Sequence, residues 1–519
     1  MSGSRRLTRG DMAQDLDQLV GLLTESHPDP YRAIGGPVAF HRAAAALGAS
    51  LPDSCPAHVW LSRLRAFVAL LQDGHTTIQA GESPADRDQR LPVTFGVLPE
   101  GLYVTGVASD GDAQWLGARL EAAGGCSAAQ LYQRTRALFG CDNPLDVWRR
   151  LALALPQPEL WSAIIDAPPG GRVPLTLALA DGTRTSPVLN WTRHPVATFR
   201  RAPDTGVRPP RGPAELGWHL VAGGNIACLS IGSLMHYREA GEVWLAAGYD
   251  APLRERAGAA LGGPPTREAL QGVVSSMPPA TQVLCELWTA MRLAHTESLV
   301  VDLTEAPGGN SVLSDMLAFA AYGLDAWIQS DGGYQIPRYS PLYHANHGRV
   351  PSAAPGAGGY DFSQEEQWRR VQDDPGLRVA LRHAEWRALL QQVPTFAAAI
   401  DTWPTWHPQV VVVTSAFTYS AGFDIACQLR QLGARHVGVA SAQAPNCFID
   451  VLRYELNRSG FTGTIAFKES WAMPESGWGC RALEPDVSLT YDDVLRFGGD
   501  SAAELRLALE RVRPAPAAG

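Results

Sequence analysis

The spacing of hydrophobic residues predicts helices at the start of the chain. In residues 8–72 apolar side chains recur every three or four positions, first around Leu16 and again around Leu64. A glycine at position 74 stops this pattern, and the β-branched residues that follow His75 favour a strand. We therefore expect an N-terminal helical region over residues 1–90, which ends in a strand carrying His75.

Residues 91–193 alternate short β-type segments with turns. The Asp181-Gly182 pair follows a strand-like run and is a hairpin signal, and one helix is expected at 128–138. These features predict a small β-rich domain. The Pro-, Gly- and Arg-rich range 194–224 then reads as a linker.

The second half of the chain has a different pattern, in which continuous apolar strands alternate with amphipathic helices. Strands are expected at 226–231, 298–303, 410–414 and 437–440, and helices at 281–294, 311–324 and 421–432. Such a pattern predicts an α/β domain with a mostly parallel sheet covered on both faces. We assign this core to residues 225–510, with an irregular insertion at 329–361 that is a candidate lid.

Composition narrows the class of protein. The chain has 519 residues, of which 45% are hydrophobic and 18% charged, as in ordinary globular proteins with several domains. The net charge is −9 and no basic run occurs, so we expect no nucleic-acid partner. No apolar run reaches the ~18 residues of a membrane span, and no signal peptide is evident. The eight cysteines are scattered, which suggests reduced thiols and a cytoplasmic location.

Ser420 is the first candidate for chemistry. It lies between an apolar strand and a helical pattern, where unpaired backbone N–H groups and the positive end of a helix dipole surround it. An acyl-transfer nucleophile needs such donors for its oxyanion. Serine is also a good helix N-cap, so a purely structural role stays open at this point.

Two further segments could complete a site. His75 follows a helix and begins a strand, and an imidazole there could act as a general base, although a hydrogen-bonded structural histidine is the alternative. Gly308 and Gly309 follow a strand, and such a pair can turn the backbone sharply and direct N–H groups into a cleft. The alternative for these glycines is a simple strand-to-helix turn.

Together these segments resemble motifs of the S41 serine peptidases, the family of C-terminal processing and tricorn-type proteases. Asp73–Thr76 matches the family's D-x-H-T, and Thr418–Gly422 matches its T-x-S-A-G. Asp302–Gly309 is similar to D-l-R-x-N-x-G-G, with Thr304 and Ala306 in place of arginine and asparagine. The range 483–487 is similar to the G-I-x-P-D-I tail.

The resemblance implies a crotonase-like spiral core and a PDZ-like domain at 91–193. It also implies that Ser420 is the nucleophile, with an oxyanion hole formed by backbone N–H groups of Gly308, Gly309 and Ala421. Family members with a Ser–Lys dyad have a lysine about 25 residues after the serine. This chain has none there, and its only lysine, Lys468, has the wrong spacing. The Ser–His arrangement of tricorn-type members therefore fits better, with His75 as the base.

The orienting acid departs from the family pattern. Tricorn-type members have a glutamate where this chain has Gly479 or Cys480. Glu475 is our candidate substitute, and Glu484 or a water molecule are alternatives. Loss of this acid usually lowers activity without abolishing it.

The sequence thus predicts a serine peptidase that acts on a peptide or protein substrate, without metal or cofactor and without a membrane partner. A catalytically silent peptide- or ligand-binding protein on the same scaffold is an alternative, because of the missing glutamate. An acyl transferase using Ser420 is another. Assembly into a homo-oligomer stays open.

Overall fold

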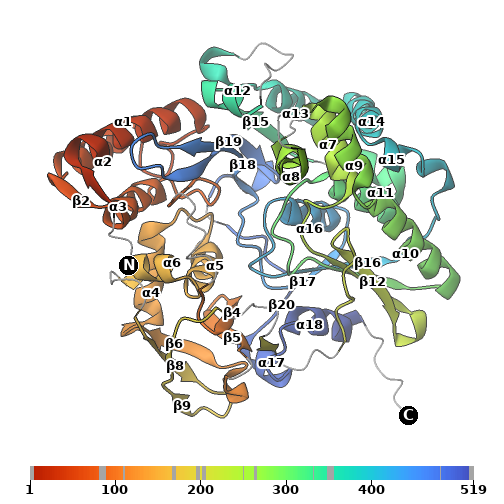
Figure 1. Ribbon diagram of the computed structural model, residues 1–519. Helices are drawn as coiled ribbons and strands as arrows, with labels where there is room; N and C mark the ends of the chain where they lie inside the picture. The colour runs from red at the N-terminus through yellow and green to blue at the C-terminus, as the bar shows by residue number, and fades with distance from the viewer. Residues whose placement is uncertain are drawn as a thin grey trace.

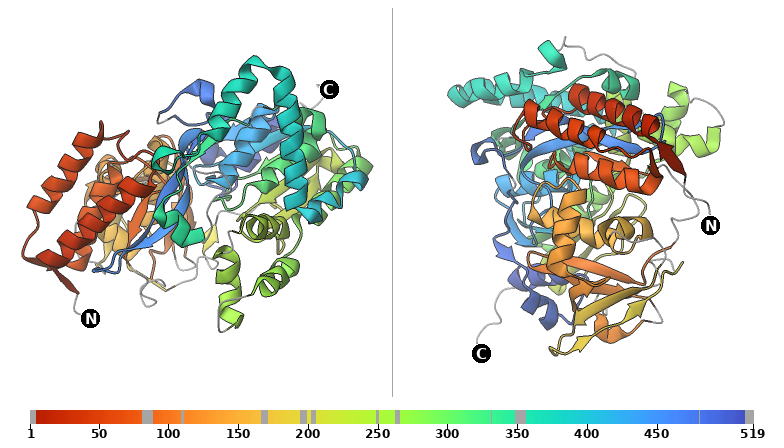
Figure 2. Two further views of the ribbon diagram at one scale, coloured as in Figure 1. Left: turned by 90° about the horizontal axis from the view of Figure 1, so that it is seen from above. Right: turned by 90° about the vertical axis from the view of Figure 1, so that its left-hand side faces the viewer.

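The fold is described from a computed structural model. It covers residues 5–512 apart from 81–88, 109–110, 166–170, 194–198, 202–205, 249–250, 262–265, 331, 348–355 and 480. Figure 1 shows the N-terminal helices at the upper left, a β-rich domain below them and the core sheet with its helices on the right. The right-hand view of Figure 2 shows the same order, with the N-terminal helices above the β-rich domain. In the part of the chain that the structure covers, no helix is long and apolar enough to cross a membrane.

The N-terminal region is helical at the positions that the hydrophobic spacing indicated. The sequence predicted that His75 lies in a strand, but it lies ahead of strand β3 (Thr77–Gln79) and not in it. It contains a short hairpin-like pair of strands and three helices, namely β1 (Arg6–Thr8), α1 (Arg9–Ser26), α2 (Pro37–Ala49), β2 (Ser54–Pro56) and α3 (Ala57–Ala69). Thr8 and Asp11 form a capping box that fixes the start of α1. The apolar faces of the helices bury Trp60 and Phe40 and pack on Phe461 and Ile465 of the hairpin that β18 (Asn446–Glu455) forms with β19 (Thr462–Trp471).

Residues 91–193 form a β-rich domain with more helix than the sequence indicated. Its strands are β4 (Val93–Leu98), β5 (Gly101–Val107), β6 (Arg119–Ala123), β7 (Cys126–Ser127), β8 (Val173–Ala178), β9 (Arg184–Thr185) and β10 (Val188–Leu189), joined by β11 (Arg200–Arg201). The 3-10 turn η1 (Ala113–Trp115) precedes β6. The expected helix is α4 (Ala128–Leu138), and the expected hairpin joins β8 to β9.

Two helices of this domain were missed, α5 (Pro144–Ala154) and α6 (Pro158–Ile165). The start of α5 has a clear local cause, because the Asn143 side chain accepts hydrogen bonds from the N–H groups of Leu145 and Asp146. Asn as N-cap followed by Pro at the first helical position is a known start signal.

The second half contains the expected sheet. Its order is β12 (Leu216–Val221), β13 (Ile226–Ile231), β14 (Ser298–Asp302), β16 (Gln409–Thr414), β17 (Arg435–Gly438) and β20 (Val487–Ser488). β12 is antiparallel to β13, and the other neighbours are parallel. The predicted strands lie at or within a few residues of their expected positions.

Helices cover both faces of this sheet, as the continuous apolar strands require. Val410 and Val412 pack in the cluster of α7 (Arg238–Ala247), α9 (Arg267–Ser276), α10 (Ala280–Ala294), α11 (Val312–Gln329), α14 (Pro375–Gln392), α15 (Pro394–Ala397) and α16 (Ala421–Gln431). Val411 and Val413 face the other way, toward α17 (Tyr491–Arg496) and α18 (Ala503–Val512). The remaining helical segments are α8 (Ala251–Leu261), α13 (Ser363–Asp373), η3 (Ala222–Gly224), η4 (Ala357–Gly359), η5 (Ile400–Thr402) and η6 (Pro474–Ser476).

A second, antiparallel sheet joins the N-terminal region to the core. β19 (Thr462–Trp471) pairs with β18 (Asn446–Glu455) on one edge. Its other edge pairs with β15 (Tyr334–Pro337) and with β3 (Thr77–Gln79). The Thr77–Thr464 register places the segment just after His75 on the core, so the N-terminal region contributes directly to the site described below.

Two expectations about irregular segments were wrong. The range read as a linker, 194–224, contains β12, which pairs along its whole length with β13 as an edge strand of the core sheet. The insertion at 329–361 contains β15 and α12 (Pro341–His347), and β15 is part of the second sheet. Residues 331 and 348–355 of the insertion lie outside the described residues. A lid formed by the whole insertion is inconsistent with the ladder that β15 makes.

Candidate active site

Ser420 occupies a strained turn between β16 and α16. Its backbone has φ 51° and ψ −124°, a region that residues with a side chain rarely adopt. Ser420 occupies the N-cap position of α16, but its side chain makes no capping hydrogen bond to the helix. Strain at a serine without a structural bond is typical of a functional position.

Hydrogen bonds from neighbouring loops hold this turn in place. The Tyr419 N–H donates to the Ala306 carbonyl at 3.0 Å, and the Thr418 hydroxyl donates to the Leu303 carbonyl at 2.8 Å. The Ser420 N–H donates to Oε1 of Gln443 at 2.6 Å. These contacts tie the turn to the loop after β14 and to the loop after β17. A backbone fixed from several sides can sustain strain of this kind.

The first of the paired glycines lies directly against the serine, and the second lies against the backbone of Leu234. A Cβ on Gly308, whose φ is +116°, would be 2.6 Å from Cβ of Ser420 and 3.2 Å from its Oγ. A Cβ on Gly309, whose φ is +142°, would be 2.4 Å from the backbone of Leu234. Among the described residues, neither glycine N–H donates a hydrogen bond. Ala421 is the first residue of α16, where an N–H has no acceptor within its own helix.

His75 packs beside the nucleophile turn but does not bond to the serine. Its ring lies on the ring of Tyr419, with centroids 4.9 Å apart and planes at 33°. Both ring nitrogens are buried and have no hydrogen-bond partner in the part of the chain described here. The backbone is fixed by the Asp73 carboxylate, which accepts from the His75 N–H at 2.8 Å, and by the Thr464 hydroxyl, which donates to the His75 carbonyl at 2.7 Å. The structure thus brings the segment of His75 beside the segment of Ser420, but His75 forms no hydrogen bond with Ser420.

The electrostatic surroundings favour a neutral imidazole. Burial lowers the pKa of His75, and the negative charges of Asp73 and Asp450 oppose this by raising it. Burial alone would raise the pKa of Asp73, but its hydrogen bonds with His27 and with the Thr76 hydroxyl hold that pKa below its usual value. A neutral imidazole with unpartnered nitrogens is able to accept a proton.

Asp142 joins the two segments and was missed from the sequence. Its Oδ1 accepts from the Gly74 N–H at 2.8 Å, and its Oδ2 accepts from the Tyr419 hydroxyl at 2.7 Å. Burial, with repulsion from Asp146 and Asp73, raises the pKa of Asp142 to about 8. Position 74 must be glycine, because a Cβ there would lie 2.1 Å from the Tyr419 hydroxyl. No local pattern marks Asp142, since its partners lie far away in sequence.

Glu475, the acid expected to orient His75, is not among the carboxylates that most affect the pKa of His75. Glu475 lies in η6, and its charge acts on the thiol of Cys427. Glu484 contributes its backbone carbonyl to Arg430. The carboxylates that most raise the pKa of His75 are those of Asp73, Asp450 and Asp146. Cys480, one of the positions aligned with the family's glutamate, lies outside the described residues.

Asp450 has features that could have drawn attention to it. It has a positive φ of 53° and forms an ion pair with Lys468, with Oδ2 and Nζ 2.6 Å apart. Lys468 is the only lysine of the chain, and a lone lysine next to a predicted strand invites a search for its carboxylate. The charge of Asp450 also acts on Asp424, one helical turn after Ser420.

Arg208, in the range that the sequence indicated as a linker, binds the segment that leads to the paired glycines. Arg208 donates from Nε to the buried Asp302 at 2.9 Å and from Nη2 to the Thr304 hydroxyl at 2.9 Å. Its Nη1 donates to Glu305 at 2.7 Å. The guanidinium therefore holds the loop that leads to Gly308 in place through hydrogen bonds. No local sequence motif marks Arg208 for this role.

The site also contains one group of side chains with ligand atoms close enough for a metal ion. Atoms of Asp73, His75 and Asp142 lie within 4.8 Å of one another. The Asp142 oxygens already accept from Gly74 and Tyr419, and the Asp73 oxygens are used by His75, Thr76 and His27. We interpret this group as a hydrogen-bond network, because its carboxylate oxygens have partners other than a cation.

Comparison with known proteins gives a fold. A scan against protein-family models and a search of curated proteins found no match. Among solved structures, mature CPAF complexed with lactacystin is 14% identical, with a TM-score of 0.57 over 97% of this chain and 98% of that one. A second structure of mature CPAF, also 14% identical, gives 0.55 over 98% and 99%. The photosystem II D1 C-terminal processing protease covers 95% of this chain at 10% identity with a TM-score of 0.41. The CPAF structures show that the chain is similar in its mixed α/β fold to mature CPAF.

Proposed function

We propose that the protein is a serine peptidase with Ser420 as the nucleophile and His75 as the general base. The observation that carries this proposal is the strained Ser420, which makes no capping bond and faces Gly308 at the start of a helix. The motif resemblance to S41 peptidases and the likeness to the CPAF fold support the same conclusion. Peptides or proteins are then the substrates.

The reaction follows from the groups around Ser420. His75 takes the proton of the Ser420 hydroxyl while Oγ attacks the peptide carbonyl. N–H groups of Gly308, Gly309 and Ala421 donate to the oxyanion. His75 then protonates the leaving amine as the C–N bond breaks, and a water molecule, deprotonated by His75, hydrolyses the ester.

The base must approach the serine for the first step. The His75 ring now lies on Tyr419, the residue before Ser420, with both nitrogens unpartnered. Catalytic hydrogen bonds are often long or unformed without substrate and tighten when it binds. In this proposal, a rotation of the imidazole about its side-chain bonds brings a nitrogen to Oγ.

Labelling with a fluorophosphonate tests the proposal. This reagent phosphonylates an activated serine, and intact-mass measurement detects the adduct. We expect one adduct on the wild-type protein, none on Ser420→Ala and strongly slowed labelling of His75→Ala. Ser415→Ala is the matched control, because Ser415 is buried in the same loop but donates its hydroxyl to the Thr304 carbonyl.

The alternatives make different predictions. A folded wild-type protein without an adduct would contradict the peptidase and favour the silent binding protein. An adduct combined with transfer of the acyl group to an added amine, rather than to water, would favour the acyl transferase. Far-ultraviolet circular dichroism of each variant shows whether the fold is retained.

A further inference from the structure

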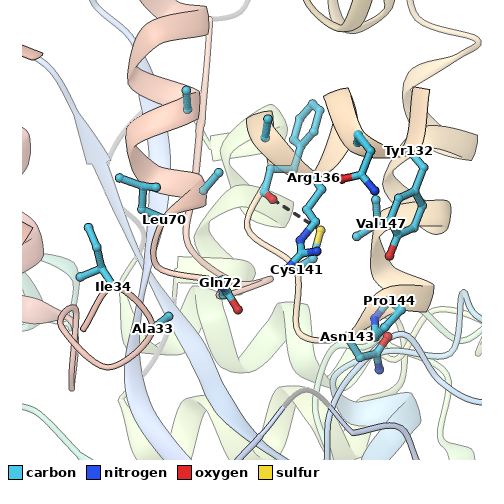
Figure 3. Close-up of a pocket in the computed structure, with 15 residues that line it drawn as sticks. Ala33, Ile34, Leu70, Gln72, Tyr132, Arg136, Cys141, Asn143, Pro144 and Val147 are labelled. Carbon is cyan, nitrogen blue, oxygen red and sulfur yellow. Dashed lines mark hydrogen bonds between the residues drawn. The ribbon is translucent and has the colours of Figure 1, made fainter. Parts of the chain in front are cut away.

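A cavity of about 590 Å³ lies between the N-terminal helices and the β-rich domain. Figure 3 shows Leu70 and Ile34 on one side of it and Tyr132 and Val147 on the other. Leu70 directly follows α3 and Ile34 lies in the loop after α1, whereas Tyr132 and Val147 belong to α4 and α5. Its size is typical of sites that bind small molecules or side chains of a peptide.

The lining of this cavity is apolar with one positive charge. Ile34, Leu70, Phe139 and Val147 are among its apolar lining residues. Among the described residues that line it, Arg136 alone carries a formal charge, and no carboxylate is present to neutralise it. In Figure 3 the Arg136 side chain extends from α4 toward Cys141. A ligand that fits this lining combines an apolar part with an anionic group.

The cavity shares a wall with the candidate active site. The connector between α4 and α5 contributes Cys141 and Asn143 to its lining. Between them, Asp142 accepts from Gly74 and from Tyr419, next to Ser420. The Asn143 side chain donates to the Ser441 carbonyl at 3.0 Å, and the Ser441 hydroxyl donates to the Thr418 carbonyl.

A smaller cavity continues from the first toward the nucleophile turn. It has a volume of about 160 Å³ and shares Ala33 and Gln72 with the larger one. Asp142, Cys447 and Ala444 line it, and Ala444 follows Gln443, which accepts the Ser420 N–H. A peptide with its scissile bond at Ser420 could therefore extend neighbouring residues into the larger cavity.

From this arrangement we propose that the larger cavity is a substrate-recognition site that binds an apolar peptide segment bearing a carboxylate, with Arg136 as its counter-ion. The inference rests on the proposed peptidase function and specifies its substrate class. The carboxylate belongs to an acidic side chain or to the chain end. Either source offers the planar oxygen pair that a guanidinium binds.

Binding of three fluorescein-labelled peptides to the Ser420→Ala variant tests the proposal. The peptides have equal length and the same leucine-rich segment. One carries an internal glutamate and a C-terminal amide, one replaces the glutamate by glutamine, and one has that glutamine with a free C-terminal carboxylate. Fluorescence anisotropy should show that at least one carboxylate peptide binds about fivefold more tightly than the uncharged one, as one partly exposed ion pair provides. The preferred peptide identifies the source of the carboxylate.

Matched variants locate the preference in the cavity. Arg136→Gln, made in the Ser420→Ala background, should remove it. Arg134→Gln should keep it, because Arg134 is exposed on the same helix but directs its guanidinium to the Ile164 carbonyl. Ala137→Trp, at an exposed position of the lining, should weaken binding of all three peptides by filling the space.

Equal binding of the three peptides, no binding at all, or equal losses in Arg136→Gln and Arg134→Gln would overturn the proposal. Because these measurements use a protein without the nucleophile, they do not depend on cleavage. A carboxylate preference without fluorophosphonate labelling of the wild type would retain the binding site and reject the peptidase. Labelling without the preference would reject the binding site alone.

Discussion

The Tyr419 hydroxyl donates a 2.7 Å hydrogen bond to the buried carboxyl of Asp142, whose other oxygen accepts from the Gly74 N–H. Tyr419 precedes the candidate nucleophile, and Gly74 precedes the candidate base. One side chain from the β-rich domain thus holds together two segments that are more than 300 residues apart in sequence. The arrangement predicts that Asp142 sets the relative position of Ser420 and His75.

Replacing Asp142 by asparagine should change how stability depends on pH. The pKa of Asp142 is about 8 in the folded protein and 3.8 in the unfolded chain, so between these values the native state binds the extra proton. The free energy of unfolding therefore falls as pH rises from about 4 to about 8. The side chain introduced by Asp142→Asn cannot ionise, so the free energy of unfolding of this variant should not fall over that pH range. Relative to wild type, the variant should become more stable by about 1 kcal/mol or more between pH 4 and pH 8, since one pKa unit corresponds to about 1.4 kcal/mol.

Urea unfolding of both proteins at several pH values measures this difference. Asp17→Asn, on the exposed face of α1, is the control and should follow the wild type. A difference between Asp142→Asn and wild type that stays constant from pH 4 to pH 8 would show that Asp142 is ionised in the folded protein.

If the backbone at Ser420 is strained, replacing the serine by glycine should give a more stable protein than replacing it by alanine. Glycine adopts φ 51° and ψ −124° without the clash of a Cβ, whereas alanine keeps that clash. Strain of this kind destabilises the folded protein by roughly 1–3 kcal/mol, and glycine relieves it. Glycine also makes the unfolded chain more flexible, which reduces stability by several tenths of a kcal/mol. We expect Ser420→Gly to be about 1 kcal/mol more stable than Ser420→Ala in urea unfolding, with both inactive. A less stable glycine variant would mean that the turn is not strained.

The pH profile of peptide hydrolysis should show whether the carboxylate of Asp450 or that of Glu475 raises the pKa of His75. The Asp450 carboxylate raises the pKa of His75, so Asp450→Asn should lower that pKa and move the acid limb of kcat/KM to lower pH. Glu475→Gln should leave the limb in place. The opposite pattern, with a shift in Glu475→Gln alone, would restore Glu475 as the orienting acid.

Loss of the Arg208 guanidinium should destabilise the glycine loop. Asp302 is fully buried, and Arg208→Gln would leave its carboxylate without the charge that it bonds at 2.9 Å. Breaking a buried pair in this way costs about 3–5 kcal/mol. Arg201→Gln is the control, because Arg201 is exposed and lies 3.9 Å from Glu305. Adding Asp302→Asn to Arg208→Gln should recover part of the loss, and a double variant no more stable than Arg208→Gln would show that the buried charge is not its cause.

Local patterns accounted for the elements on which the site is built. The apolar run before Ser420 and the amphipathic run after it correctly predicted β16 and α16, and the alternation of such runs predicted the mostly parallel sheet. The same reasoning located the N-terminal helices and α4. This reasoning failed for β12, because the residues before it are rich in glycine and proline and resemble a loop. In the structure β12 pairs with β13. Residues 216–221 form a strand because a neighbour supplies the hydrogen bonds.

The sequence by itself determined which residue types could perform acyl transfer and on which strands and helices they lie. It did so because hydrophobic spacing, glycine and β-branched residues act over a few positions. Only the tertiary structure decided which charges surround them. Asp142 bonds to Gly74 and Tyr419, the charge of Asp450 acts on His75, and Arg208 binds Asp302 at the start of the glycine loop. All three come from segments that are distant along the chain. Such contacts depend on how whole elements pack, and no short pattern in the sequence specifies that packing.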